Sequence, residues 1–285
     1  MLSLTAIDGD SLELNMEIAS PSIYLDQWAL VTFSKDLNLG RKFIEFLKYK
    51  RGTICLSWMN LLELGKSSDT QINSVKDFLE IALPNVLFIE CNPFVVMDRE
   101  EVLLGGVIPN EHLVIDAEMN RELLSRPRHV QSLNLFSIDN VFSDILDGSL
   151  VKRLESLQTT TVKFIRSQKR LVEEDAAKRN IVKNFLSQGR LPYDVRSSFQ
   201  LICRSIFVDR NVSFEPNDAC DFFHTIVPST YCDFILIDSH WKDKVERAQR
   251  EIIKRGLKTP HFAKAYSKKK QEVDRYMDEI ERNLC

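Results

Sequence analysis

The chain has 285 residues, of which 44% are hydrophobic and 28% are charged, and its formal net charge is −3. This composition is typical of a globular protein with one elaborated domain or two small ones, and it provides no overall positive field for nucleic acid, although a local basic stripe would be enough. No stretch approaches the roughly 20 apolar residues of a membrane helix, and the N-terminus lacks the pattern of a signal peptide. We therefore expect a cytoplasmic protein with no membrane partner.

The first part of the chain alternates between strand-like and helix-like segments. Residues 22–30 (SIYLDQWAL) form an apolar run that predicts a short strand with Asp26 at its end. A second predicted strand is followed by a helix that begins at Ser57 and carries Glu63. The remaining segments are a helix over 36–51, the second strand at 53–56, a helix over 72–83 and a strand at 85–90. Strands separated by helices indicate parallel pairing and the α/β class.

The middle of the chain reads as mainly helical. Residues 150–189 form a long polar stretch with helical periodicity that ends at Gly189, and 193–210 predict a further helix. The alternation then resumes with a helix over 217–227, a strand at 233–238, a helix over 240–255 and a charged helix over 262–284. We predict one α/β domain in two halves (20–97 and 211–256), interrupted by a helical insertion (98–210) and followed by a C-terminal helix (257–285).

The six cysteines contain no C-x-x-C pair, and most of them lie in apolar segments. This pattern favours buried free thiols over a disulfide or zinc framework.

Residues 217–241 crowd several acids around an apolar run, namely Asp218, Asp221, Asp233 and Asp238. Like charges repel one another, and carboxylates near apolar neighbours lose hydration. Either water solvates each acid, or a cation brings several of them together.

The predicted topology allows such a convergence. Ligands of open parallel sheets bind beyond the carboxyl ends of the strands, where Asp26 and Asp238 are expected. Asp221 shares a helix face with Asp218, and Glu63 lies on the helix after the second strand. Four acids from separate elements could therefore meet. Oxygen ligands without His or Cys suit Mg²⁺ or Mn²⁺.

Three segments resemble the PIN-domain family of metal-dependent nucleases: IYLDQW, LSWMNLLELGK and NDACDFFHTIVPSTYCDFILIDSHW. The resemblance covers about half the chain, roughly 20–90 and 215–256. It implies a PIN-like three-layer α/β fold with a central, mostly parallel sheet, elaborated here by the helical insertion. It also implies hydrolysis of phosphodiester bonds, mainly in single-stranded or structured RNA, by water that Mg²⁺ or Mn²⁺ activates.

The resemblance assigns ligand and water-activating positions to Asp26, Glu63, Asp221 and Asp238, and it leaves Asp218 or Asp233 for a second metal. Two positions depart from the family pattern. Trp28 and Ile237 stand where small polar residues are usual.

Several alternatives stay open. His224 is either a packing or capping residue, which we favour, or a phosphate contact. Basic groups such as Lys169–Arg170 form either a solvated helical face or a stripe that follows phosphates; the others are Lys152–Arg153, Lys178–Arg179 and Lys268–Lys270. The protein as a whole is either an active nuclease or a catalytically idle PIN-like module whose insertion binds a partner protein. We expect deletion of 98–210 to leave the metal site assembled and to weaken nucleic-acid binding.

Overall fold

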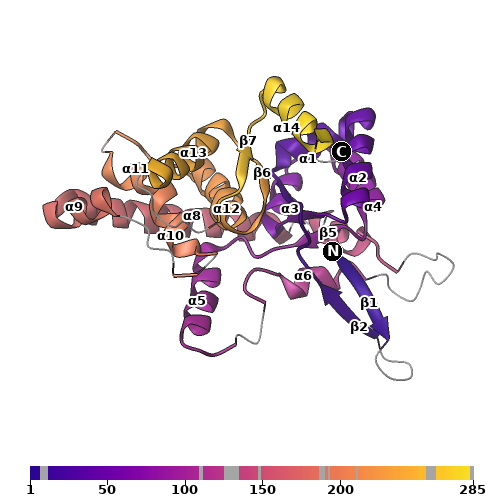
Figure 1. Ribbon diagram of the computed structural model, residues 1–285, viewed down its shortest axis with the longest axis horizontal. Coiled ribbons are helices and arrows are strands. Elements are labelled where there is room, and N and C mark those ends of the chain that lie inside the picture. The colour runs from indigo at the N-terminus through magenta and orange to yellow at the C-terminus, as the bar shows by residue number, and fades with distance from the viewer. Residues whose placement is uncertain are drawn as a thin grey trace.

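The computed structural model describes residues 1–6, 12–108, 112–124, 135–146, 149–185, 190–191, 193–209, 211–254 and 261–282 (Figure 1). Its centre is a five-stranded sheet in the order β5-β4-β3-β6-β7, and all of its pairings are parallel. The strands are β3 (Ser22–Leu25), β4 (Thr53–Leu56), β5 (Val86–Phe88), β6 (Phe234–Leu236) and β7 (Lys264–Tyr266). The α/β class predicted from the alternation is confirmed.

Fourteen helices accompany this sheet in the described residues. The helices up to residue 146 are α1 (Gln27–Lys35), α2 (Leu37–Lys50), α3 (Trp58–Leu64), α4 (Asp69–Ala82), α5 (Pro93–Leu104), α6 (Ala117–Arg121) and α7 (Asp139–Leu146). The later ones are α8 (Ser149–Glu174), α9 (Ala176–Asn184), α10 (Val195–Ile202), α11 (Arg204–Val208), α12 (Pro216–Tyr231), α13 (Ser239–Lys254) and α14 (Lys270–Arg282).

The sheet separates two hydrophobic cores, because successive side chains of a strand point to opposite faces. Ile23 and Leu25 of β3 pack in one core with α1, α2, α4 and α14. Tyr24, between them, packs in the other core with α8, α10, α12 and α13. Figure 1 shows these two groups of helices on either side of the sheet. Strands covered on both faces are apolar throughout, which explains why their sequences read as continuous runs.

The strand order reverses between β3 and β6. From β3 the chain moves outward through β4 to β5, whereas β6 pairs on the other side of β3 and continues to β7. This reversal is a topological switch point, and the crevice beyond the carboxyl ends of the two strands is the usual ligand site of such sheets. Asp26 and Asp238 follow these two strands.

The structure corrects several sequence predictions. Residues 27–30, the last part of the strand-like run at 22–30, lie in α1, because Asp26 follows β3 and caps this helix. The segment 262–284 begins with β7, which joins the sheet beside β6, before α14 starts at Lys270. The helix predicted over 193–210 is two helices, α10 and α11. A hairpin of β1 (Leu2–Ala6) and β2 (Leu12–Met16) precedes the sheet, and Gly189 lies outside the described residues.

The expected insertion is built into the main core. Helix α8 packs against α3 and α12, and its Val162 and Ile165 are buried in the same core as Tyr24 of the central strand. Arg166 of α8 also pairs with Glu215 at 2.7 Å, next to the start of α12. These contacts argue against the expectation that residues 98–210 could be deleted with the site intact, since the deletion would expose this core.

Five cysteines are buried free thiols, as the sequence predicts: Cys55, Cys91, Cys203, Cys220 and Cys232. No helix in the described ranges is long and apolar enough to cross a membrane.

Gly40 sets the approach of α2 to α1, the helix that Asp26 caps. A Cβ atom at Gly40 would lie far inside van der Waals contact with the carbonyl oxygen of Phe33, a backbone atom that cannot turn away. We expect Gly40→Ala to lower the free energy of unfolding by about 2 kcal/mol in urea denaturation, as overpacking does. Gly105→Ala is the control, because its Cβ would meet no atom closer than 3.3 Å. Equal stability of Gly40→Ala and the wild type would contradict this packing.

Candidate metal centre

Asp26 is held rigidly at the carboxyl end of the central strand. It stands between β3 and α1 as the N-cap of that helix, and its Oδ1 accepts a hydrogen bond from the backbone N–H of Gln27 at 2.5 Å. Its own N–H donates to the carbonyl oxygen of Leu236 at 3.0 Å, which ties the ends of β3 and β6 together. The residue is only 6% exposed. Its carboxylate is thus a fixed, desolvated group at the switch point.

Glu63 is brought beside Asp26 by the local structure around α3. Ser57 precedes this helix, as predicted, and Asn60 accepts a hydrogen bond from the Ser57 N–H at 2.8 Å. The amide of Asn60 donates to the carbonyl oxygen of Leu25 at 2.8 Å, which anchors the helix to the end of β3. Gln27 then donates to the carbonyl oxygen of Glu63 at 3.1 Å. These bonds fix the helix that aims Glu63 at the switch point.

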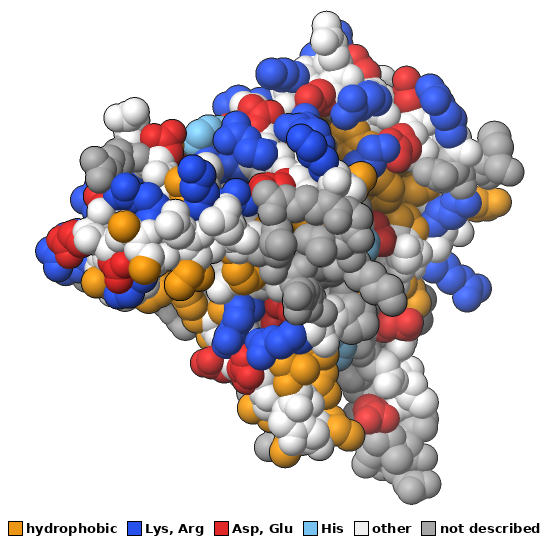
Figure 2. Space-filling view, turned by 60° about the vertical axis from the view of Figure 1, so that its left-hand side comes forward, with side chains coloured by type: hydrophobic (Ala, Val, Ile, Leu, Met, Phe, Trp, Pro, Cys, Tyr) orange, Lys and Arg blue, Asp and Glu red, His pale blue; other side chains and the backbone are white. Residues whose placement is uncertain are grey.

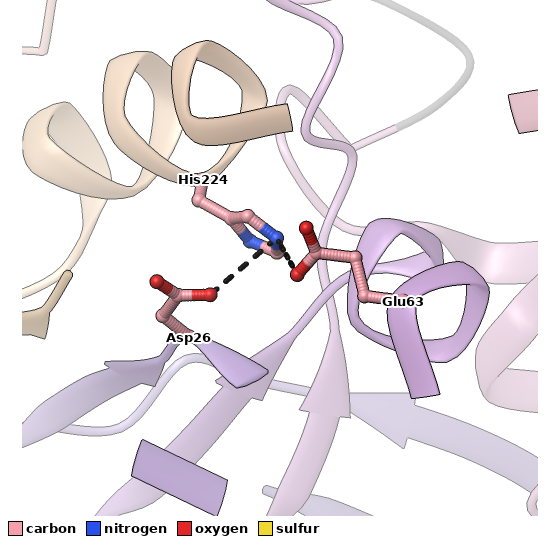
Figure 3. Close-up of side chains that lie close together, drawn as sticks. All are labelled: Asp26, Glu63 and His224. Atoms are coloured by element: carbon pink, nitrogen blue, oxygen red, sulfur yellow. Dashed lines mark hydrogen bonds and ion pairs between the residues drawn. The ribbon is translucent and has the colours of Figure 1, made fainter. Parts of the chain in front are cut away.

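His224 completes the group from the opposite side. It is fully buried on α12, and its Nε2 lies 2.9 Å from Oε2 of Glu63 and 3.6 Å from Oδ1 of Asp26. Figure 3 shows the three side chains pointing toward one another from β3, α3 and α12. One ligand atom from each lies within 4.8 Å of the others.

A buried hydrogen-bond chain orients the His224 ring. Its Nδ1 lies 2.5 Å from the hydroxyl of Tyr24, which lies 2.8 Å from Oγ of Ser57. Ser57 in turn donates to Asn60. Because the Ser57 hydroxyl hydrogen is used in that bond, the Ser57 oxygen accepts a hydrogen bond from the Tyr24 hydroxyl. The Tyr24 oxygen in turn accepts a hydrogen bond from Nδ1–H of His224. This assignment leaves Nε2 facing the two carboxylates, the arrangement by which outer partners orient a histidine ligand.

The charges of the group act on one another strongly. Burial raises the pKa of Asp26 to about 6, with the His224 charge opposing this shift and the Glu63 charge adding to it. Burial also opposes ionisation of Glu63, but the charge and hydrogen bond of His224 outweigh it and lower the pKa of Glu63. Burial disfavours the charged form of His224, yet the surrounding acids raise its pKa to about 9. Without another cation, the His224 imidazolium is the positive charge that holds these acids together.

Asp221 and Asp238 face the same region. Burial and then the Asp26 charge raise the pKa of Asp221 to about 7, and Asp238 and Glu63 add to the shift. Asp238 also raises the pKa of Asp26. It follows β6, accepts from the His240 N–H at 2.9 Å and lies 3.6 Å from Lys268. Both acids therefore add negative charge to the centre, outside the group of three whose ligand atoms approach within 4.8 Å.

The other two acids of the sequence motif have different roles. Asp233 precedes β6 and accepts hydrogen bonds from Ser20 and from the backbone and hydroxyl of Ser22. It lies at the amino edge of the parallel sheet, about 17 Å along the chain from Asp238 at roughly 3.3 Å per residue. This position argues against Asp233 as a ligand of the second metal, the role that the resemblance left to Asp218 or Asp233. Asp218 accepts from the Glu215 N–H at 2.8 Å and closes the capping box of α12.

His224 is the residue that sequence reasoning undervalued. The sequence favours a packing or capping role over a phosphate contact, whereas the structure places its Nε2 atom beside Glu63 and Asp26. The available signal was the spacing D-x-x-H from Asp221, which puts both side chains on one helix face. The cluster that could hold an ion therefore includes a nitrogen, whereas the sequence predicted oxygen ligands alone.

Ile237 and Trp28, the two residues that depart from the family pattern, both pack in the hydrophobic cores. Ile237 is buried in the core with α12 and α13, and its N–H donates to the carbonyl oxygen of Tyr266 at 3.0 Å. Trp28 packs against the other core from the first turn of α1. Neither residue supplies a polar atom to the centre.

The buried cluster of Asp26, Glu63 and His224 could hold a metal ion. Two carboxylates and an imidazole are ordinary ligands of divalent metals, and neighbouring Asp221 and Asp238 leave the centre more negative than one imidazolium can balance. No protein-family model, curated protein or solved structure matches this chain.

Proposed function

We propose that this protein is a metal-dependent nuclease that hydrolyses phosphodiester bonds in single-stranded or structured RNA. The observation that carries the proposal is the convergence of Asp26 and Glu63 at the switch point of a parallel sheet. Asp221 and Asp238 lie close enough to this place to shift the pKa values of neighbouring acids. The choice of RNA rests on the resemblance to the PIN-domain family.

Asp26, Glu63 and the Nε2 atom of His224 would hold the ion, with Asp221 and Asp238 available through water. The mixed oxygen and nitrogen donors favour Mn²⁺ over Mg²⁺, because imidazole suits the softer ion. A bound divalent ion would supply an activated water and stabilise the negative charge that develops on the phosphate. The chain's own residues fix the geometry: Asn60 and Gln27 place Glu63, and Tyr24 orients His224.

One observation favours the second candidate, an idle PIN-like module. The 2.9 Å contact between His224 and Glu63 is an ion pair in its own right. In this view the imidazolium replaces the metal, and the remaining helices bind a protein partner.

A cleavage assay separates the two candidates. The purified chain is incubated with end-labelled mixed-sequence single-stranded RNA, with a matched DNA, in Mn²⁺, Mg²⁺, Zn²⁺ or EDTA. The nuclease proposal expects RNA cleavage that requires Mn²⁺ or Mg²⁺, is faster with Mn²⁺ and stops in EDTA. No cleavage with any of the metals, or equal cleavage in EDTA, would favour the idle module.

A further inference from the structure

A pocket between α9, α10, α11 and α13 has four cations and two acids among its lining residues. It has a volume of about 280 Å³. Its charged lining residues are Lys183, Arg204, Asp209, Lys244, Arg247 and Glu251. The floor is apolar and includes Leu201, Ile202 and Ala248. Figure 2 views the molecule with the side that carries α9 and α11 brought forward, and Lys and Arg side chains gather across the upper part of this face.

The two acids of the pocket are already occupied. Glu251 pairs with Arg204 at 2.6 Å. Asp209 accepts a hydrogen bond from the N–H of Asn211 at 2.9 Å. Within the described part of the chain, no carboxylate forms an ion pair with Lys183, Lys244 or Arg247. The four cations of the pocket therefore outnumber its two acids.

Lys244 is the most informative of these cations. It is only 8% exposed, and its ammonium lies 4.6 Å from the centre of the Trp241 ring. Burial lowers its pKa, while Cys203, Asp218 and Asp221 oppose this shift, and the nearby Arg247 charge adds a smaller lowering. A buried lysine that faces another cation is costly unless an anion joins them.

The pocket adjoins the acidic centre. Helix α13 begins directly after Asp238, and Lys244 is six residues further along, about 9 Å at 1.5 Å per residue. The effect of Asp221 on the pKa of Lys244 gives independent support for this proximity. A stacked strand advances about 3.4 Å per nucleotide, so the same strand could reach both places within about three nucleotides.

We propose that Lys244 and Arg247 form a phosphate-binding subsite that holds a backbone phosphate of the strand whose scissile bond lies at the acidic centre. The proposal rests on the proposed function for its occupant. It differs from the stripe considered on α8, where Lys169 and Arg170 pair with acids one turn along the same helix, at 3.8 and 3.5 Å. Lys244 and Arg247 of α13, by contrast, form no ion pair with a carboxylate in the described ranges of the chain.

The test measures binding without cleavage. Fluorescence anisotropy in EDTA follows a labelled single-stranded RNA of 12 nucleotides over a range of salt concentrations. The first variant, Lys244→Met, removes the charge and keeps an unbranched apolar side chain against Trp241. The second variant, Arg247→Gln, removes the charge of an exposed side chain. Arg250→Gln is the matched control on α13, because Arg250 is exposed, pairs with Glu246 and lies outside the pocket lining.

We expect each pocket variant to weaken RNA binding about 10-fold and to reduce the slope of log K against log salt, by about 0.7 for one lost phosphate contact. Arg250→Gln should bind like the wild type, because it lies outside the pocket lining. Wild-type affinity and slope in both pocket variants would overturn the subsite.

A second arm replaces RNA with inorganic phosphate and follows thermal stability. Stabilisation by phosphate in a protein that binds no RNA would mean that the pocket takes free phosphate, which overturns the strand assignment. RNA binding that depends on Lys244 and Arg247, in a protein that cleaves nothing, would uphold the subsite while the nuclease proposal fails. No binding of either probe would overturn the subsite.

Discussion

Asp26→Asn is expected to abolish RNA cleavage while the fold is retained. The amide keeps an oxygen that can accept the hydrogen bond from the Gln27 N–H, so the cap of α1 survives. It removes one negative charge from the group that would hold the ion. Loss of an outer partner of a metal ligand costs about 10–100-fold in activity, and loss of a ligand should cost more. We therefore expect a decrease of at least about 100-fold in the rate measured with Mn²⁺.

The same variant should not lose stability without metal. The folded state raises the pKa of Asp26 to about 6 from 3.8, so its ionisation opposes folding, and this cost grows as the pH rises from about 4 to about 6. At pH 7.5 the neutral amide avoids this cost, and the free energy of unfolding should stay level or rise by up to about 3 kcal/mol. Urea denaturation in EDTA measures this effect.

Asp218→Asn is the matched control for cleavage, because Asp218 accepts a hydrogen bond at the start of α12 instead of joining the centre. It should retain cleavage within a few-fold of the wild type. Equal cleavage by wild type and Asp26→Asn would mean that the activity lies elsewhere or comes from a contaminant.

His224→Gln is expected to give the largest loss of stability without metal. It removes the buried imidazolium that lies against Glu63 and Asp26 and leaves both carboxylates without a counter-charge. Breaking a buried ion pair by removing one partner costs about 3–5 kcal/mol, and protonation of the acids will relieve part of it. We expect the free energy of unfolding in EDTA at pH 7.5 to fall by about 3 kcal/mol.

A double-mutant cycle with Glu63→Gln isolates the contact. The double variant should be more stable than the sum of the single effects implies, by at least about 1 kcal/mol, because Glu63 no longer needs a cation. The exposed His240 provides the control, since His240→Gln should change stability by less than about 0.5 kcal/mol. If His224→Gln is as stable as the wild type, His224 does not compensate the acids.

Much of the sheet could be predicted from sequence, because its strands are covered on both faces and read as apolar runs between helices. The run at 22–25 and the acid that follows it led directly to Asp26 at the strand end. β7 was missed because a three-residue strand in a charged segment leaves almost no pattern. No expectation covered the β1–β2 hairpin, whose Leu2 is buried in the core with α1, α2, α4 and α14.

The centre was only partly predictable for a related reason. Asp233 and Asp238 stand before and after the three-residue strand β6, so they lie at opposite edges of the sheet. In the sequence, both acids simply border the same short apolar run. Only the parallel register with β3 distinguishes the two edges. The burial of His224 and the direction of its ring depend on Tyr24, which is 200 residues away in sequence. Local pattern carries no information about such a contact.

Anomalous diffraction from a crystal of the wild-type protein soaked in Mn²⁺ tests the central claim, that these acids form a metal centre. The account expects one strong manganese peak within about 2.0–2.6 Å of a carboxylate oxygen of Asp26 and one of Glu63, with the His224 Nε2 atom turned to the ion. The peak should disappear in Asp26→Asn crystals treated identically. A wild-type map with no peak there, and with His224 still hydrogen-bonded to Glu63, would contradict the metal centre.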